Sequence, residues 1–181
     1  MLTYDLIVIG FGKAGKTLAA KMAAQGKKVA LIERSKAMYG GTCINIACIP
    51  TKTLLVAAEK GLAFDQVMAE KNAVTSRLNG KNYAAISGAG VDIIDAEAHF
   101  LSNKVIEITA GDEKEEMTAE TIVINTGSVS NVLPIPGLTE TVHVYDSTGI
   151  QNLKELPKRL GVLCVGNIGL EFAVLYNKLR S

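Results

Sequence analysis

The chain has 181 residues, a formal net charge of +1 and no tryptophan, and 48% of its residues are hydrophobic. This composition is typical of an ordinary globular protein, and the chain lacks the basic excess that nucleic-acid and anionic-membrane binding use. The opening residues MLTYDLIVIG carry an acid and no basic leader, unlike a signal peptide, and no apolar run approaches the about 18 residues of a membrane span. We therefore expect a cytoplasmic protein with no nucleic-acid partner and no membrane partner.

The N-terminal residues predict a β-α-β unit that begins with a glycine-rich turn. An apolar run at residues 4–9 predicts a buried parallel strand, an alanine-rich helix follows to about residue 25, and residues 28–32 predict the next strand. The turn reads GFGKAG, and Glu33 ends the second strand 18 residues after Gly15. This succession indicates a dinucleotide-binding fold. A glycine-rich turn in another α/β protein is the alternative.

Each conspicuous residue of the glycine-rich motif has an expected task. Gly10 permits a tight turn, Gly12 lets the backbone approach a pyrophosphate, and Gly15 allows the helix to pack closely on the strand. Glu33 would hold a pair of ribose hydroxyls. We expect Lys13 and Lys16 to face solvent.

Two cysteines lie five residues apart in the segment GGTCINIACIPTK, residues 40–52. Regular helix would separate the Cα atoms of Cys43 and Cys48 by about 7.5 Å along its axis, whereas a disulfide tolerates about 7 Å. Pairing therefore requires irregular backbone, and Pro50 fits an irregular entry into the helix expected from Thr51. Cys48 would lie near the N-terminus of that helix, where the macrodipole favours a reactive thiolate.

Two other interpretations of the cysteines stay open. They are two unpaired cysteines in a small-residue loop, or they belong to a metal site. The metal interpretation is the weaker one, because the third cysteine, Cys164, and the two histidines, His99 and His143, form no recognisable ligand spacing. We expect no metal.

The remaining chain predicts helices and short strands. A helix is expected at residues 64–79, and strand-like runs with turns between them suggest an antiparallel meander whose charged segment GDEKEE is a hairpin tip. A strand and a helix near the end form the first β-α step of a second dinucleotide fold. The predicted strands are residues 91–94, 96–101, 105–109, 116–118, 122–124 and 160–165, and the last helix is residues 168–179.

Together GFGKAG, VALIE and GGTCINIACIPTK resemble the FAD domain of the class I pyridine nucleotide-disulfide oxidoreductases, the family of glutathione reductase, dihydrolipoamide dehydrogenase and mercuric reductase. Within it, GGTCIN and CIPTKTL are most similar to the reactive-chlorine-resistance and hypothiocyanous-acid reductase flavoproteins, and INTGS, PIPG, YDST and GNIGLEFA also match in order. The resemblance implies an α/β fold in which residues 1–148 form a Rossmann-like FAD-binding domain with a parallel sheet and a small antiparallel β-meander, lacking its C-terminal return segment. Residues 149–181 would start a truncated Rossmann-like NAD(P)-binding domain.

The resemblance also implies roles for individual residues. Cys48 would be the thiol beside the flavin and Cys43 the thiol that attacks the substrate, whereas Lys52 would lie beside flavin N5 and pair with Glu171. Without the family, a solvated helix charge is the simpler interpretation of both Lys52 and Glu171. The implied cofactor-binding residues are Gly10, Gly12, Gly15, Glu33, Gly41, Thr42, Lys52, Ala98, Thr126 and Gly127.

The family implies electron flow from NAD(P)H through FAD to the Cys43–Cys48 disulfide and then to a small oxidant or disulfide substrate. A homodimer is expected of the full-length family and not of this chain, which lacks the dimerisation domain. The alternative is a non-enzymatic truncated fragment acting at most as an FAD-binding or dithiol module. A thiol-disulfide carrier without flavin is a third hypothesis, although it leaves GFGKAG and Glu33 without a purpose.

Four positions depart from the family pattern. The second dinucleotide fold has its own glycine-rich motif, CVGNIG, in which Cys164 and Val165 replace two glycines, so a side chain stands at the tight turn. We expect Cys164 to be a buried strand thiol. Arg180 replaces the glycine expected after the last helix. Ala47 stands where glycine precedes the second redox cysteine, and its φ angle decides whether a Cβ is tolerated there.

Overall fold

The computed structural model describes residues 1–164 and 166–180, and they form two compact units. Unit 1 comprises residues 1–45 and 77–127, and unit 2 comprises residues 46–76 and the described residues from 128 on. The elements are β1 (Leu2–Ile9), α1 (Lys13–Ala23), β2 (Val29–Glu33), the 3-10 helix η1 (Lys36–Met38), α2 (Thr42–Asn45), α3 (Cys48–Glu59), α4 (Phe64–Gly88), β3 (Asp92–Asp95), β4 (Glu97–Ser102), β5 (Val105–Ala110), β6 (Glu113–Ile124), the 3-10 helix η2 (Gly149–Asn152) and α5 (Asn167–Lys178).

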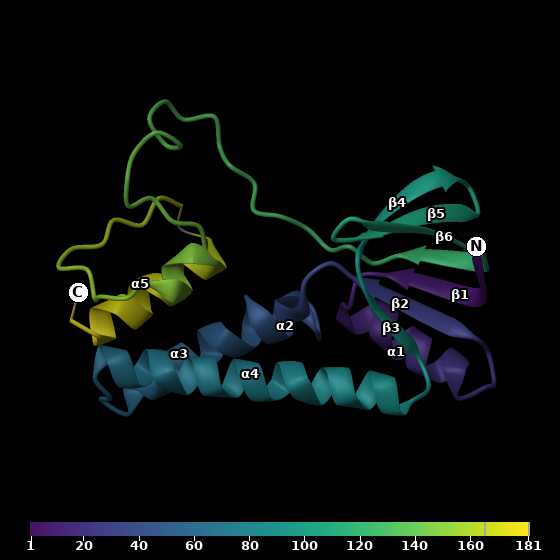
Figure 1. Ribbon diagram of the computed structural model, residues 1–181. Coiled ribbons are helices and arrows are strands. Elements are labelled where there is room, and N and C mark those ends of the chain that lie inside the picture. Colours follow the sequence, from purple (N-terminus) through teal and green to yellow (C-terminus); the bar gives the residue numbers. More distant parts are fainter. Residues whose placement is uncertain (165, 181) are drawn as a thin grey trace. The chain divides into compact units, whose positions relative to one another are not determined.

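Unit 1 is built on a six-stranded sheet with the order β3-β2-β1-β6-β5-β4 (Figure 1). The strands β3, β2, β1 and β6 run parallel, whereas β4, β5 and β6 form an antiparallel meander. Strand β6 belongs to both parts, because it pairs with β1 on one side and with β5 on the other. The predicted Rossmann-like α/β fold with a small meander is confirmed.

Strand β2 is buried on both faces of the sheet of unit 1. Val29 and Leu31 belong to the apolar cluster on the face that α1 covers, whereas Ala30 and Ile32 belong to the cluster on the opposite face. Successive side chains of a strand point to opposite faces, so a continuous apolar run such as VALI suits a strand covered on both sides. Full burial of one such large side chain contributes roughly 1.5–3 kcal/mol.

Unit 2 packs α3, η2 and α5 around its own apolar cluster, which includes Leu54, Phe172 and Leu175. The buried Tyr176 hydroxyl donates a hydrogen bond to the Ile150 carbonyl oxygen at 2.8 Å, and burial raises the pKa of Tyr176 to about 12. This bond attaches η2 to α5. Helix α4 contributes its first half to unit 2 and its second half to unit 1.

Several predicted elements are corrected by the structure. The described residues of the predicted strand 160–165 form no strand, and Val165 lies outside the described residues. The apolar pattern there lacks the neighbouring strand that a parallel sheet requires. His143 lies in an irregular segment with φ 64°.

Other boundaries also differ from the predictions. Helix α4 extends nine residues beyond 79, to Gly88, and α3 begins at Cys48 rather than Thr51. The charged segment GDEKEE is not a hairpin tip as a whole, because Glu113 already starts β6 and only residues 111 and 112 form the turn. In addition, β3 joins the parallel strands instead of the meander. Among the described residues, no helix is long and apolar enough to cross a membrane.

Candidate functional site

In unit 1 the glycine-rich turn closes on Asn125, which follows β6. Gly10 has φ 105°, and a Cβ there would lie 2.3 Å from the Asn125 carbonyl oxygen, while a Cβ on Gly12 or Gly15 would lie 2.8 or 2.6 Å from the Asn125 amide nitrogen. That nitrogen donates a hydrogen bond to the Gly10 carbonyl oxygen at 2.9 Å. A side chain at Gly10 would therefore meet backbone, whereas one at Gly12 or Gly15 would displace the side chain of Asn125. The sequence analysis missed Asn125, although it belongs to the motif INTGS.

The N-terminus of α1 is suited to an anion. Gly12 is its N-cap and provides no side-chain cap, and the first turn contains no acidic residue. The first backbone N–H groups of a helix lack intrahelical partners, and together with the helix dipole they favour a phosphate group. The residues present at this turn therefore fit the pyrophosphate of a dinucleotide.

Glu33 ends β2 beside the glycine-rich turn. Its carboxylate accepts hydrogen bonds from the backbone N–H groups of Phe11, at 3.0 Å, and Ser35, at 3.1 Å. These bonds hold the side chain, which is only 9% exposed, and each carboxylate oxygen keeps acceptor capacity for a further donor such as a ribose hydroxyl. The predicted ribose-binding acid and glycine-rich turn thus lie together in unit 1.

Four more predicted cofactor residues gather at this turn. A Cβ on Gly41 would lie 2.7 Å from the Gly12 Cα atom, and a Cβ on Gly127 would lie 3.8 Å from the Thr42 hydroxyl oxygen. Thr126 follows Asn125 in the same segment. Ala98 lies on β4, opposite Ile108 of β5.

Cys43 lies in α2 of unit 1, where it is exposed, and interacts electrostatically with Lys16 of α1. Contrary to expectation, Lys16 is buried, and its ammonium group donates a hydrogen bond to the Asn82 side-chain oxygen. Burial and the charge of Lys13 lower the pKa of Lys16, whereas the charge of Cys43 acts in the opposite direction. No sequence pattern indicated that Lys16 is buried beside Cys43, because a lysine on a helix usually faces solvent.

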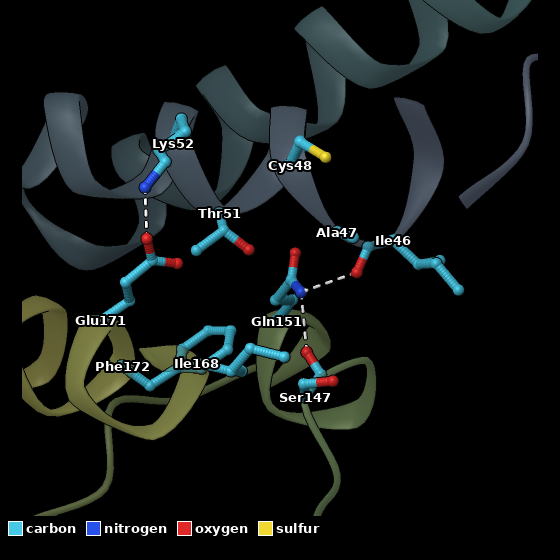
Figure 2. A pocket seen from close by; sticks show the side chains of 10 residues that line it. All are labelled: Ile46, Ala47, Cys48, Thr51, Lys52, Ser147, Gln151, Ile168, Glu171 and Phe172. Carbon is cyan, nitrogen blue, oxygen red and sulfur yellow. Dashed lines mark hydrogen bonds and ion pairs between the residues drawn. The ribbon is translucent and has the colours of Figure 1, made fainter. Parts of the chain in front are cut away.

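In unit 2 a cavity of about 260 Å³ lies beside the first turns of α3 (Figure 2). Cys48, the first residue of α3, carries an exposed free thiol at this cavity. The Lys52 ammonium group donates to the Glu171 carboxylate, so α3 and α5 are joined by an ion pair. The lining residues are Ile46, Ala47, Cys48, Thr51, Lys52, Ser147, Gln151, Ile168, Glu171 and Phe172.

Gln151 of η2 is a second residue that the sequence analysis missed. It is only 3% exposed, and its amide nitrogen donates to the carbonyl oxygens of Ile46, at 3.1 Å, and Ser147, at 2.7 Å. Its amide oxygen is buried without a hydrogen-bond partner among the described residues. No sequence pattern identified it, because a glutamine in a short polar segment is usually exposed.

The departures from the family pattern have different structural outcomes. Ala47 has φ −131°, so its Cβ is tolerated in the turn before α3. Cys164 is exposed and lies outside any strand, with φ 109°, so the predicted buried strand thiol is wrong. Arg180 adopts φ 66°, the left-handed conformation for which glycine was expected.

The fold, the glycine-rich turn with its acid, and the two cysteines define one class of protein. Residues 4–181 match the model of the pyridine nucleotide-disulphide oxidoreductases, and the chain belongs to this family of FAD-binding, NAD(P)H-dependent flavoprotein disulfide reductases.

The chain is similar in sequence and structure to individual members of this family. Over its whole length the chain is 49% identical to the probable pyridine nucleotide-disulfide oxidoreductase RclA of Escherichia coli strain K12. It is also 34% identical to a mercuric reductase of Staphylococcus aureus over 98% of the chain, spanning 35% of that protein. The solved Cu(II) complex of the HOCl-induced flavoprotein disulfide reductase RclA from Escherichia coli superposes with a TM-score of 0.97 at 48% identity over the whole chain. The chain spans 41% of the length of RclA in both comparisons.

Proposed function

We propose that this chain provides the FAD-binding and dithiol portion of an NAD(P)H-dependent flavoprotein disulfide reductase. In this proposal residues 1–148 are the FAD-binding domain and residues 149–181 begin the NAD(P)-binding domain. The observation that carries it is the position of Cys48, whose free thiol starts α3 at a cavity that also contains the Lys52–Glu171 ion pair. A helix N-terminus favours a thiolate, which is the reactive form of cysteine.

FAD would be held by unit 1 through the residues of the glycine-rich turn. The uncapped N-terminus of α1 at Gly12 would bind the pyrophosphate, Glu33 would accept ribose hydroxyls, and Thr42 would donate a hydrogen bond to phosphate. Thr126 and Gly127 would contact the cofactor after β6. When bound, FAD supplies the means of passing a hydride equivalent from NAD(P)H to a disulfide.

The two cysteines would divide the thiol chemistry between them. Reduction of a Cys43–Cys48 disulfide consumes two electrons and two protons and yields two thiols. Cys43, which is exposed on α2, would attack an oxidised substrate, and Cys48 would then close the disulfide and release the reduced product. The substrate would be a small oxidant or a disulfide compound.

Lys52 and Glu171 would tune this centre electrostatically. A cation beside the cofactor stabilises negative charge that develops on reduction, and the Glu171 carboxylate orients the Lys52 ammonium group. Because Lys52 is 63% exposed and Glu171 34% exposed, the pair itself adds little to stability, and its importance would lie in orientation.

Reconstitution with FAD tests the proposal directly. The purified chain should become yellow, and two-electron reduction should add a long-wavelength charge-transfer band that depends on Cys48. Cys48→Ser should abolish this band, whereas Cys43→Ser should retain a thiolate able to give it. Failure to bind FAD, or identical spectra of the two variants, would contradict the proposal.

The second candidate is a non-enzymatic FAD-binding or dithiol module. The chain spans 41% of the length of RclA, and this candidate needs only the glycine-rich turn and the two cysteines described above. Steady-state reduction of a model disulfide with NADH or NADPH distinguishes the two. Turnover by the reconstituted chain supports a reductase, whereas FAD binding without turnover supports the module. For the complete family architecture we propose a homodimer located in the cytoplasm.

A further inference from the structure

The two residues that connect α2 and α3, Ile46 and Ala47, lie between the two cysteines in the sequence. Both of their carbonyl oxygens are engaged. The Ala47 carbonyl oxygen accepts the Thr51 N–H at 3.1 Å, inside the first turn of α3. The Ile46 carbonyl oxygen accepts a hydrogen bond from the Gln151 side chain at 3.1 Å, 105 residues away in the sequence. The backbone immediately before Cys48 is thus attached to η2.

Gln151 is itself firmly held. Its amide nitrogen also donates to the Ser147 carbonyl oxygen at 2.7 Å. The buried Lys71 ammonium group donates to the Gln151 backbone carbonyl oxygen at 2.8 Å. Side chain and backbone of Gln151 are therefore both fixed, so the Ile46 carbonyl meets a rigid donor.

The amide oxygen of Gln151 shows that this arrangement is not optimised for stability. It has no hydrogen-bond partner among the described residues, and Figure 2 shows it directed toward α3 between the side chains of Thr51 and Cys48. A buried acceptor without a partner destabilises a fold, because it has lost its water and gained no hydrogen bond, whereas an apolar side chain of similar size carries no such penalty. A residue with this defect beside a reactive thiol is expected to serve function.

We propose that Gln151 is a positioning residue that holds the Ile46–Ala47 turn, and with it Cys48, in the dithiol geometry. This inference rests on the proposed redox role of Cys43 and Cys48. A disulfide limits the separation of its two Cα atoms to about 7 Å, so the conformation of the turn before Cys48 bears on the equilibrium between dithiol and disulfide. A side chain that fixes the turn where Cys48 carries a free thiol stabilises the reduced state relative to the disulfide.

The test is the redox equilibrium of the full chain with dithiothreitol, in a Cys164→Ser background. Gln151→Met keeps the side-chain volume but loses the donor, and it should shift the equilibrium toward the disulfide by about threefold or more. The matched control is Tyr176→Phe, which removes the hydrogen bond to the carbonyl oxygen of the neighbouring Ile150 and leaves the hydrogen bonds of Gln151 itself in place. This control should lower thermal stability and leave the redox equilibrium unchanged.

The outcomes separate this inference from the proposed function. If the parent chain forms no Cys43–Cys48 disulfide, both are overturned. If the disulfide forms but Gln151→Met shifts the equilibrium no more than Tyr176→Phe does, only the positioning role is overturned. Gln151→Asn retains the amide on a shorter side chain, and it should shift the equilibrium in the same direction. This second variant decides the matter if Gln151→Met does not fold.

Discussion

The chain contains two glycine-rich turns before helices, and the first residues of the two turns have nearly the same φ angle. Gly10 has φ 105° in the first turn, and Cys164 has φ 109° in the second. The first turn follows β1 in a six-stranded sheet, whereas the second follows residues that form no strand. The φ angle of the first position is thus nearly the same where neither the glycine nor the preceding strand is present.

The difference between the two turns separates two reasons for a glycine at the first position: its φ angle and the space that a Cβ would need. At Gly10 a Cβ would meet backbone atoms of Asn125, so glycine is needed both for its φ angle and for space. At Cys164 an exposed side chain is present, and the φ angle alone is unfavourable for a residue other than glycine. The first turn therefore tolerates no side chain, and the second carries one at the expense of backbone strain.

Gly10→Ala should have the largest effect. The added Cβ would lie 2.3 Å from the Asn125 carbonyl oxygen, at a φ angle that alanine rarely adopts, so we expect a loss of about 3 kcal/mol or more in the free energy of unfolding. Urea denaturation followed by circular dichroism measures this loss. FAD binding should disappear with it.

A double-mutant cycle provides the control for this prediction. A Cβ on Gly12 would contact the side chain of Asn125 at 2.8 Å, and not its backbone. Asn125→Ala should therefore partly rescue Gly12→Ala and leave Gly10→Ala unrescued. Equal rescue of both variants would show that Gly10 lies in a looser environment than the structure indicates.

Cys164→Gly should have the next largest effect and the opposite sign. Removing the side chain relieves a backbone conformation that costs a residue other than glycine about 1–3 kcal/mol, although glycine also gains entropy in the unfolded chain. We expect a net stabilisation of about 1 kcal/mol, measured by thermal denaturation. Cys164→Ala retains the Cβ and should give no gain. Equal stabilisation by both variants would assign the effect to the thiol.

Lys16 follows the last glycine of the first turn, and Leu170 follows the last glycine of the second. The variant Lys16→Leu therefore gives the first turn the residue of the second. Burial lowers the pKa of Lys16, so the unfolded chain binds this proton more tightly than the fold does. The contribution of Lys16 to stability therefore rises with pH through the window below its ordinary pKa of 10.5. The stability of the parent relative to Lys16→Leu should increase as the pH rises toward 10.5, measured by urea denaturation.

The same variant should slow alkylation of Cys43 at neutral pH by about threefold, because the thiolate loses a neighbouring cation. The exposed Lys21 of α1 provides the control, and Lys21→Leu should change neither quantity. An unchanged alkylation rate in Lys16→Leu would show that Lys16 does not affect the reactivity of Cys43.

The sequence predicted those parts of the fold that local patterns determine. The run VALIE predicted β2, the alanine-rich segment predicted α1, and GFGKAG predicted the turn that the structure shows. The run from Leu160 failed because a parallel strand depends on neighbours that no local pattern can supply. Strand β3 was assigned to the meander, because nothing in its own residues shows which strand it pairs with.

The candidate site divides in the same way. The residues with recognisable spacing, such as Gly12, Glu33 and Cys48, could be identified from the sequence alone. Asn125, Gln151 and the burial of Lys16 could not, because their contacts join residues more than 60 positions apart. Their roles depend on tertiary packing, which residue type and spacing do not encode.

The central place of β6 has a consequence for synthesis on the ribosome. Strand β1 is complete after residue 9, yet its partner β6 begins only at Glu113. One edge of β1 therefore stays unpaired until about a hundred further residues have been translated. Until then a nascent chain exposes an unsatisfied row of backbone groups beside apolar side chains, which invites association with other chains. We therefore expect slower translation or a lower growth temperature to affect the soluble yield more than changes in the surface charge of the finished protein.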